Sequence, residues 1–170
     1  MTGPIVELAA GRIEGRHSGP VLTFKGIPYA APTGGRNRFG PPQPVSAWAG
    51  VLDAKDYGPT APQPPPPPAR LDEATELPQS EDCLVLNVWT ADTTGAKPVL
   101  FWIHGGGFST GSGSLPWYDG GALARRGDVV VVTVNHRLGL LGYLDLGAVG
   151  GPNYANSGNA GMLDLIAALR

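Results

Sequence analysis

The chain has 170 residues, of which 42% are hydrophobic and 15% are charged, and its formal net charge at pH 7 is −2. This hydrophobic content is sufficient for one globular domain with a sizeable core. No cluster of Lys and Arg is present that could neutralise phosphate groups, so nucleic acid is not expected as a partner. No apolar run approaches the roughly 20 residues that cross a bilayer, so no membrane association is expected.

The start of the chain and its cysteine content bear on the cellular compartment. Glu7, Arg12 and Glu14 interrupt the first residues, so no apolar stretch of signal-peptide length is found there. The single cysteine, Cys83, cannot form an internal disulfide, which agrees with a reducing environment. We therefore expect a cytoplasmic protein.

Loop dominates the first half of the chain after a short strand that is predicted over residues 21–25. From Gly26 to about Leu77, Pro and Gly recur so often that mostly loop is expected. Five consecutive prolines at 64–68 favour polyproline II geometry, which predicts a stiff surface loop over residues 58–80 or, alternatively, a ligand for a proline-binding module. So long a loop is unusual in a compact domain and indicates a segment that packs over a larger body.

The centre of the chain predicts several strands, two of which belong to a parallel strand–helix–strand unit. Residues 84–90 mix apolar and β-branched side chains and are predicted to form a strand. Residues 99–103 (VLFWI) and 129–134 (VVVVTV) are continuous apolar runs, as expected for strands buried on both faces of a sheet. Residues 118–126 between them are long enough for a short crossover helix, so these two strands are predicted to be parallel.

A last helix is predicted over residues 159–170, where apolar residues recur at helical spacing. These apolar residues are Met162, Leu165, Ile166 and Leu169. Asn156, Ser157 or Asn159 is expected to cap the start of this helix. No Gly or Pro closes it before the sequence stops, so we expect the helix, and the body it packs on, to continue beyond Arg170.

The motif His104-Gly105-Gly106-Gly107-Phe108 directly follows the strand predicted over residues 99–103. Consecutive glycines allow positive φ and close approach of the backbone, so that successive N–H groups can point at one spot. Such donors stabilise the negative oxygen that develops when a nucleophile attacks an ester carbonyl, and a loop of this type forms half of the oxyanion hole in lipases and esterases. A tight turn or a phosphate-binding loop is the alternative, but the flanking His and Phe and the apolar strand before them favour the oxyanion function.

Ordered motifs along nearly the whole chain resemble the N-terminal third of type-B carboxylesterases, the family of bacterial para-nitrobenzyl esterases and cholinesterases. The matching segments are FKGIPYA (24–30), RF (38–39), Trp48, SEDCL (80–84), WIHGGGF (102–108), YDG (118–120), NHRLG (135–139) and NAGMLD (159–164). The resemblance implies that residues 1–170 are the N-terminal segment of a single α/β-hydrolase domain, an α/β fold whose central sheet is incomplete in this chain. It also implies hydrolysis of small-molecule carboxylic esters through an acyl-enzyme, without a cofactor.

The resemblance assigns functional residues as well. It implies that Gly106 and Gly107 supply amides to the oxyanion hole, with Phe108 beside them as a substrate-binding side chain. It implies two buried ion pairs, Arg38 with Glu81 and Arg137 with Asp164, each of which would fasten a loop to the sheet. The nucleophile, the acid and the catalytic histidine of the family are all expected beyond residue 170, so the missing C-terminal part of the same protein is the expected partner.

Other candidate residues are weaker. Gly107-Phe108-Ser109-Thr110-Gly111 fits the pattern G-x-S-x-G, but a nucleophile elbow requires a sharp turn from a strand into a helix, and the glycines and proline that follow oppose a helix. His17, His104 and His136 are not expected to act as bases; His136 stands where the family usually has Tyr and is interpreted as tolerated packing. Neither an HExxH motif nor paired Cys/His spacing is present, so no metal site is predicted.

Two alternatives to an ester hydrolase remain open at the level of sequence. One is a non-catalytic relative that acts through surface contacts, like the adhesion proteins that share this fold. The other is an inactive truncated fragment. By resemblance, the strand at residues 99–103 would pair on its open side with the absent strand that leads to the nucleophile. Taken alone, the chain is therefore expected to aggregate or to become ordered only with a partner chain that supplies the missing strands.

Overall fold

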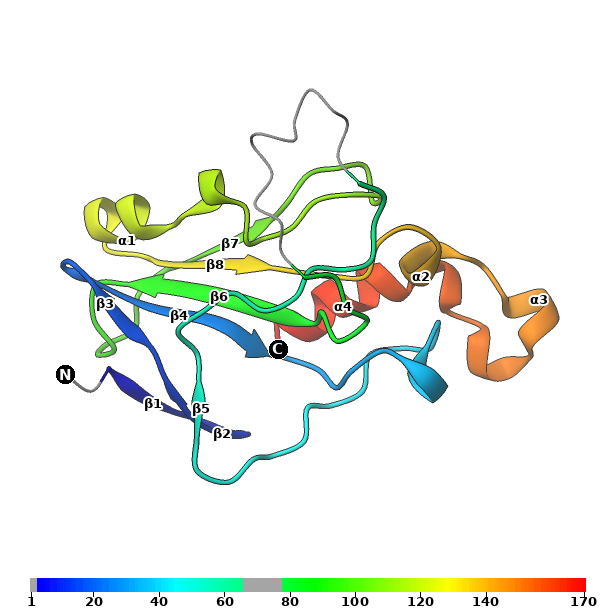
Figure 1. The fold of residues 1–170 in the computed structure, drawn as a ribbon, viewed down its shortest axis with the longest axis horizontal. Helices are drawn as coiled ribbons and strands as arrows, with labels where there is room; N and C mark the ends of the chain where they lie inside the picture. The colour runs from blue at the N-terminus through cyan, green and yellow to red at the C-terminus, as the bar shows by residue number, and fades with distance from the viewer. Residues whose placement is uncertain (1–2, 66–77) are drawn as a thin grey trace.

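The structure, a computed structural model, describes residues 3–65 and 78–170 (Figure 1). Its strands are β1 (Ile5–Leu8), β2 (Gly11–Glu14), β3 (Arg16–Ser18), β4 (Val21–Pro28), β5 (Val51–Asp53), β6 (Val85–Thr90), β7 (Val99–Ile103) and β8 (Val130–Val134). Its helices are α1 (Gly121–Gly127), α2 (Gly139–Tyr143), α3 (Gly147–Gly150) and α4 (Ala160–Ala168). Short 3-10 turns are η1 (Gly35–Asn37), η3 (Pro116–Tyr118), η4 (Pro152–Tyr154) and η5 (Ser157–Asn159).

The strands form two sheets. A five-stranded sheet has the order β3-β4-β6-β8-β7, and a three-stranded sheet has the order β1-β2-β5. Between the sheets, Ile13 of β2 packs with Phe24 and Ile27 of β4. On the other face of the larger sheet, Ala124 of α1 packs against Trp89 of β6 in a second buried cluster. The larger sheet therefore carries apolar side chains on both faces, as expected for the central sheet of an α/β protein.

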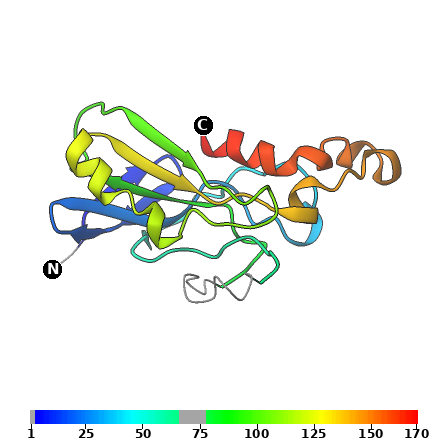
Figure 2. The ribbon, with the colours of Figure 1, turned by 90° about the horizontal axis from the view of Figure 1, so that it is seen from above.

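The predicted parallel strand–helix–strand unit is confirmed. Strand β7 pairs with β8 in parallel, with Val99 opposite Val130, and α1 lies between them in the chain. Helix α1 begins at Gly121, inside the crossover segment predicted over residues 118–126, and Pro116–Tyr118 before it forms the 3-10 turn η3. The unit places the carboxyl ends of β7 and β8 at the same end of the sheet, where α2, α3 and α4 also gather (Figure 2).

Strand β4 is longer than predicted. It runs from Val21 to Pro28, because an irregularity in its pairing with β6 between Phe24 and Ile27 lets the strand continue through Gly26. Gly26 has φ of 65° and donates its N–H to the buried Asn87 side chain, with 3.0 Å between N and Oδ1. Gly26 was expected to end the strand, but it lies at a β-bulge inside β4.

The long loop predicted after Gly26 is largely present but contains two short elements, η1 and β5. Strand β5 pairs in parallel with β2 and completes the smaller sheet. Part of the surface loop predicted over residues 58–80, including most of its proline run, lies outside the described residues. Its described ends are joined by an isolated bridge between Thr60 and Gln79, so they lie side by side.

The open side expected for the strand at residues 99–103 is confirmed, whereas the prediction that it is buried on both faces is wrong for this chain. Among the described residues, strand β7 has one neighbouring strand, β8, and forms the edge of the five-stranded sheet. Its side chains are open to solvent, with exposed fractions of 62% for Val99, 44% for Trp102 and 47% for Ile103. The apolar sequence fits a buried strand, but burial also requires neighbours on both sides and both faces.

The last helix is present as α4, with Asn159, one of the predicted caps, at its N-cap position. The Asn159 side chain makes no capping hydrogen bond among the described residues, and Ser157 accepts a hydrogen bond from the amide of Leu146 at 2.7 Å. Only part of the predicted apolar face is covered: Leu165 is 4% exposed, whereas Met162 is 41% and Ile166 46% exposed. The open side of α4 and the open edge of β7 are therefore both apolar surfaces without a neighbour among the described residues.

Candidate oxyanion site

The glycine loop begins where β7 ends, at His104, and returns to the body of the protein at Gly111. Its outer part is tied to the segment that follows β8, because the amide of Gly139 donates to the carbonyl oxygen of Phe108 at 2.7 Å. Since β7 and β8 are parallel, both loops leave the same end of the sheet. This end is where ligands bind in open α/β sheets.

The backbone of the loop requires glycine at its centre. Gly106 has φ of 124° and Gly107 has φ of 60°, and Phe108 shares the left-handed conformation with φ of 62°. A Cβ atom on Gly106 would lie 1.9 Å from the carbonyl oxygen of Thr110, so no other residue fits there. The loop closes on itself, because the amides of Ser109 and Thr110 both donate to the carbonyl oxygen of Gly106 at 3.2 Å.

The amides of Gly106 and Gly107 are free donors. Neither N–H group has an acceptor among the residues that the structure describes, and both glycines are exposed. A backbone N–H is a strong donor, and an exposed one without a protein acceptor is available to water or to a bound ligand. Two adjacent unpaired amides in a fixed turn can therefore donate to an anionic oxygen from outside the chain.

His104 anchors the start of the loop as a neutral side chain. It is 7% exposed, and its Nδ1 lies 2.8 Å from the carbonyl oxygen of Gly105. Its ring stacks on that of His136, with 4.9 Å between centroids and 14° between planes. Burial lowers the pKa of His104 to about 4 and also lowers the pKa of His136. Position 136 thus contributes a flat ring that packs on the loop's histidine.

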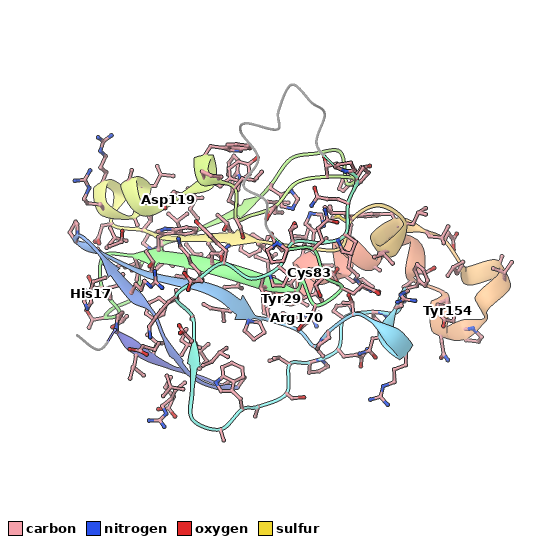
Figure 3. The ribbon with its side chains drawn as sticks, in the orientation of Figure 1. His17, Tyr29, Cys83, Asp119, Tyr154 and Arg170 are labelled. Carbon is pink, nitrogen blue, oxygen red and sulfur yellow. The ribbon has the colours of Figure 1, made fainter. Side chains whose placement is uncertain are left out.

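Ser109 does not have the surroundings of a nucleophile. It lies in a turn of the glycine loop, exposed, and its hydroxyl donates to the carbonyl oxygen of Gly107 at 3.3 Å. No helix follows it directly, since the next helical turn is η3. His17 lies on β3, which forms the opposite edge of the five-stranded sheet from β7, the strand that leads into the glycine loop (Figure 3). The G-x-S-x-G match is therefore one turn of the glycine loop.

Aromatic side chains flank the loop. Phe108 is 58% exposed and packs on the ring of Tyr143 in α2, with 5.1 Å between centroids. Trp117 is 56% exposed and lies against Tyr118, whose ring in turn contacts that of Trp102. The structure thus places the predicted substrate-binding residue Phe108 at the surface, next in the chain to the two free amides.

The structure brings Arg137 and Asp164 together in the interior. Their side chains are 2% and 0% exposed, and Asp164 accepts hydrogen bonds from Nε of Arg137 at 2.8 Å, from its Nη2 at 2.6 Å and from its backbone amide at 3.0 Å. Nη1 of Arg137 donates to the carbonyl oxygen of Gly40 at 2.8 Å. The pair fastens α4 and the η1 region to the segment that follows β8.

The pair of Arg38 with Glu81 is formed but is not buried, which corrects the expectation for it. Nε of Arg38 lies 2.7 Å from Oε2 of Glu81, yet the side chains are 45% and 25% exposed. The hydrogen bond from Arg38 lowers the pKa of Glu81. Because water screens such a pair, its contribution to stability is expected to be small and well below that of a buried pair.

Asn135 was missed as a structural residue of the site, although it lies in a matching motif. Its Oδ1 accepts hydrogen bonds from the amide of Gly113 at 2.8 Å and from the hydroxyl of Ser112 at 3.1 Å. Its Nδ2 donates to the carbonyl oxygen of Pro59 at 3.0 Å. A polar residue directly after an apolar strand was the available signal. Asn135 joins the exit of the glycine loop to the proline-rich segment.

Other parts of the described chain do not resemble a catalytic centre. The cavity between the two sheets is lined mainly by apolar residues, among them Leu8, Phe24 and Val88, and does not include the glycine loop. Within residues 3–65 and 78–170, no group of three His, Cys, Asp or Glu side chains could hold a metal ion. In the same ranges, no helix is both long and apolar enough to span a membrane.

A mixed sheet with a parallel strand–helix–strand unit, and a glycine loop at the carboxyl end of β7, define the N-terminal part of an α/β-hydrolase. Comparison with protein families matches residues 2–170 to the carboxylesterase family, and the chain therefore belongs to that family. This confirms the resemblance seen in the sequence and the fold that it implied.

Curated and solved relatives agree with this assignment. Para-nitrobenzyl esterase from Bacillus subtilis is 48% identical over 172 residues, which cover 100% of this chain and 34% of that protein. Phenmedipham hydrolase from Pseudarthrobacter oxydans is 46% identical over 85% of this chain and 30% of its own length. A crystal structure of a carboxylesterase from Geobacillus stearothermophilus matches 98% of this chain and 33% of its own, with 50% identity and a TM-score of 0.89. The chain thus spans about a third of the length of the relatives it matches.

Proposed function

We propose that this chain supplies the oxyanion-binding loop of a serine carboxylesterase. The nucleophilic serine, the acid and the histidine base would come from chain outside residues 1–170, as the family resemblance implies. The reaction would proceed by attack of the serine on an ester carbonyl, release of the alcohol, and hydrolysis of the acyl-enzyme by water. No step requires a cofactor.

The observation that carries the proposal is the pair of free amides at Gly106 and Gly107. As the serine attacks, the carbonyl oxygen of the ester gains negative charge, and donors that are already in place stabilise it without reorganisation. The strained turn that exposes these amides is set by Gly106, where a Cβ atom would collide with Thr110. By resemblance, a third amide would come from the residue after the nucleophile.

The substrate is proposed to be a small-molecule carboxylic ester. The relatives carry the names para-nitrobenzyl esterase, phenmedipham hydrolase and fumonisin B1 esterase, so family membership alone leaves the substrate open within this class. The exposed ring of Phe108 supports a role as one apolar wall for the ester. A cytoplasmic location, and the absence of nucleic-acid and membrane partners, stay predictions that rest on the sequence.

The test uses the complete protein, meaning the product of the whole reading frame that encodes this chain. It should hydrolyse a short-chain p-nitrophenyl ester and should be labelled on a serine beyond residue 170 by a fluorophosphonate probe. Residues 1–170 alone should not exceed a no-protein control. An inactive and unlabelled complete protein would instead favour a non-catalytic relative. Activity of residues 1–170 that disappears in Ser109→Ala would overturn the assignment of the nucleophile.

A further inference from the structure

Gln63, in the proline-rich segment, is bonded to both backbone groups of Gly111, where the glycine loop ends. Its Oε1 accepts the N–H of Gly111 at 2.7 Å, and its Nε2 donates to the carbonyl oxygen of Gly111 at 2.9 Å. The hydroxyl of Thr60 reaches the same carbonyl oxygen at 3.3 Å. A side-chain amide that satisfies both groups of one residue fixes the position of that residue and its peptide orientation.

Gly111 transmits this constraint to the start of the glycine loop. It has φ of 115°, and a Cβ atom there would lie 2.4 Å from both the carbonyl oxygen of Gly105 and Nδ1 of His104. The backbone of Gly111 is thus in close contact with the two residues that precede Gly106. Moving Gly111 would therefore shift the entry to the loop as well as its exit.

The segment that carries Gln63 is itself held in place. The backbone N–H of Gln63 donates to Oε1 of Gln79 at 2.9 Å, and the side-chain Nε2 of Gln63 lies 3.0 Å from Oγ1 of Thr60. Thr60 forms an isolated β-bridge with Gln79, and the side chain of Asn135 donates a hydrogen bond to the carbonyl oxygen of Pro59. Nε2 of Gln63 also lies 3.2 Å from the carbonyl oxygen of Ala61, so its side chain is bonded to Thr60 and Ala61 as well as to Gly111.

From these contacts we infer that Gln63 is a positioning residue, which sets the geometry of the two oxyanion amides by clamping Gly111. The inference rests on the proposed function and deepens it, since Gln63 touches neither the ester nor the nucleophile. Misplacing a catalytic group by about 1 Å can cost on the order of 10²-fold in rate. The competing interpretation is that these bonds only anchor the proline-rich segment, in which case losing them would affect stability but not the chemical step.

The test compares Gln63→Leu and Gln63→Glu with Gln43→Leu in the complete protein. Gln43 is an exposed glutamine whose side chain bonds only to the carbonyl oxygen of Pro41 among the described residues, so it is a matched control. In Gln63→Leu, kcat should fall about 10–100-fold while KM changes less than about threefold. Gln63→Glu keeps an acceptor for the N–H of Gly111 but replaces the donor by a carboxylate oxygen that faces the carbonyl oxygens of Gly111 and Ala61, and should also lower kcat.

Hydrogen exchange provides a readout that does not depend on activity. Peptides containing Gly111 should exchange at least about tenfold faster in Gln63→Leu than in Gln43→Leu, because the N–H of Gly111 loses its acceptor. Unchanged exchange, or a kcat for either Gln63 variant within twofold of the control, would overturn the inference. If Gln63→Leu does not fold, Gln63→Glu decides by kcat alone, because it keeps the acceptor for the N–H of Gly111. If the complete protein with native Gln63 hydrolyses no ester, the proposed function fails, and exchange at Gly111 alone decides whether the clamp exists.

Discussion

Replacing Asp164 by Asn removes the negative charge of the buried ion pair while it preserves the size of the side chain. Asp164 is fully buried and accepts three hydrogen bonds from Arg137, at 2.6 Å, 2.8 Å and 3.0 Å. Asn retains one acceptor oxygen, but its NH₂ group would face a guanidinium N–H, so the charge of Arg137 would stay buried without a counter-charge. Breaking a buried pair in this way costs about 3–5 kcal/mol. We expect a loss of this size in the free energy of unfolding.

The assay is urea unfolding of the complete protein followed by tryptophan fluorescence, with Glu81→Gln as the matched control. Glu81→Gln makes the same chemical change in the exposed pair, where a much smaller loss of stability is expected. Replacing both Arg137 and Asp164 by Leu should recover part of the loss, because no unpaired charge then remains. The reasoning is refuted if Asp164→Asn and Glu81→Gln destabilise the protein equally, or if a double-mutant cycle of Arg137 and Asp164 shows no coupling.

Three further predictions follow from the loop, its histidine and the open sheet edge. Gly106→Val in the complete protein should lower kcat on the order of 10²–10³-fold with little change in KM, and an unchanged kcat would mean that the loop is only a turn. The pKa of His104 is lowered from 6.5 to about 4 in the folded protein, so between these pH values the histidine is protonated in the unfolded state but not in the folded state. About 3 kcal/mol of folding stability should therefore be lost as the pH falls from about 6.5 to 4. Urea unfolding over this pH range should show a shallower decline in His104→Gln; an equal decline would contradict the assignment. Residues 1–170 alone should elute from a size-exclusion column as aggregates unless a partner chain covers β7, whereas a monodisperse monomer with slow hydrogen exchange over Val99–Ile103 would show the sheet edge to be stable by itself.

Local patterns determined much of this protein without reference to its fold. The apolar runs before His104 and before Asn135 predicted β7 and β8, because a buried strand needs continuous apolar residues whatever its neighbours are. The spacing between these runs allowed a crossover helix, and hence a parallel pair. The glycines of the loop indicated positive φ because that conformation is a property of single residues, and Gly106 and Gly107 both have it.

The tertiary structure decided which side chains are buried and which are exposed, because burial depends on the residues that pack against each side chain. The exposed edge of β7, the burial of Arg137 with Asp164 and the exposure of Arg38 with Glu81 all reflect what packs against each side chain, which no local pattern encodes. The clamp of Gln63 on Gly111 joins residues 48 positions apart. A glutamine among prolines carries no sequence signal, since its role comes from two backbone groups that only the folded chain brings within hydrogen-bond distance. The identity of the loop was therefore readable in the sequence, whereas the side chains that hold it in place were determined by packing.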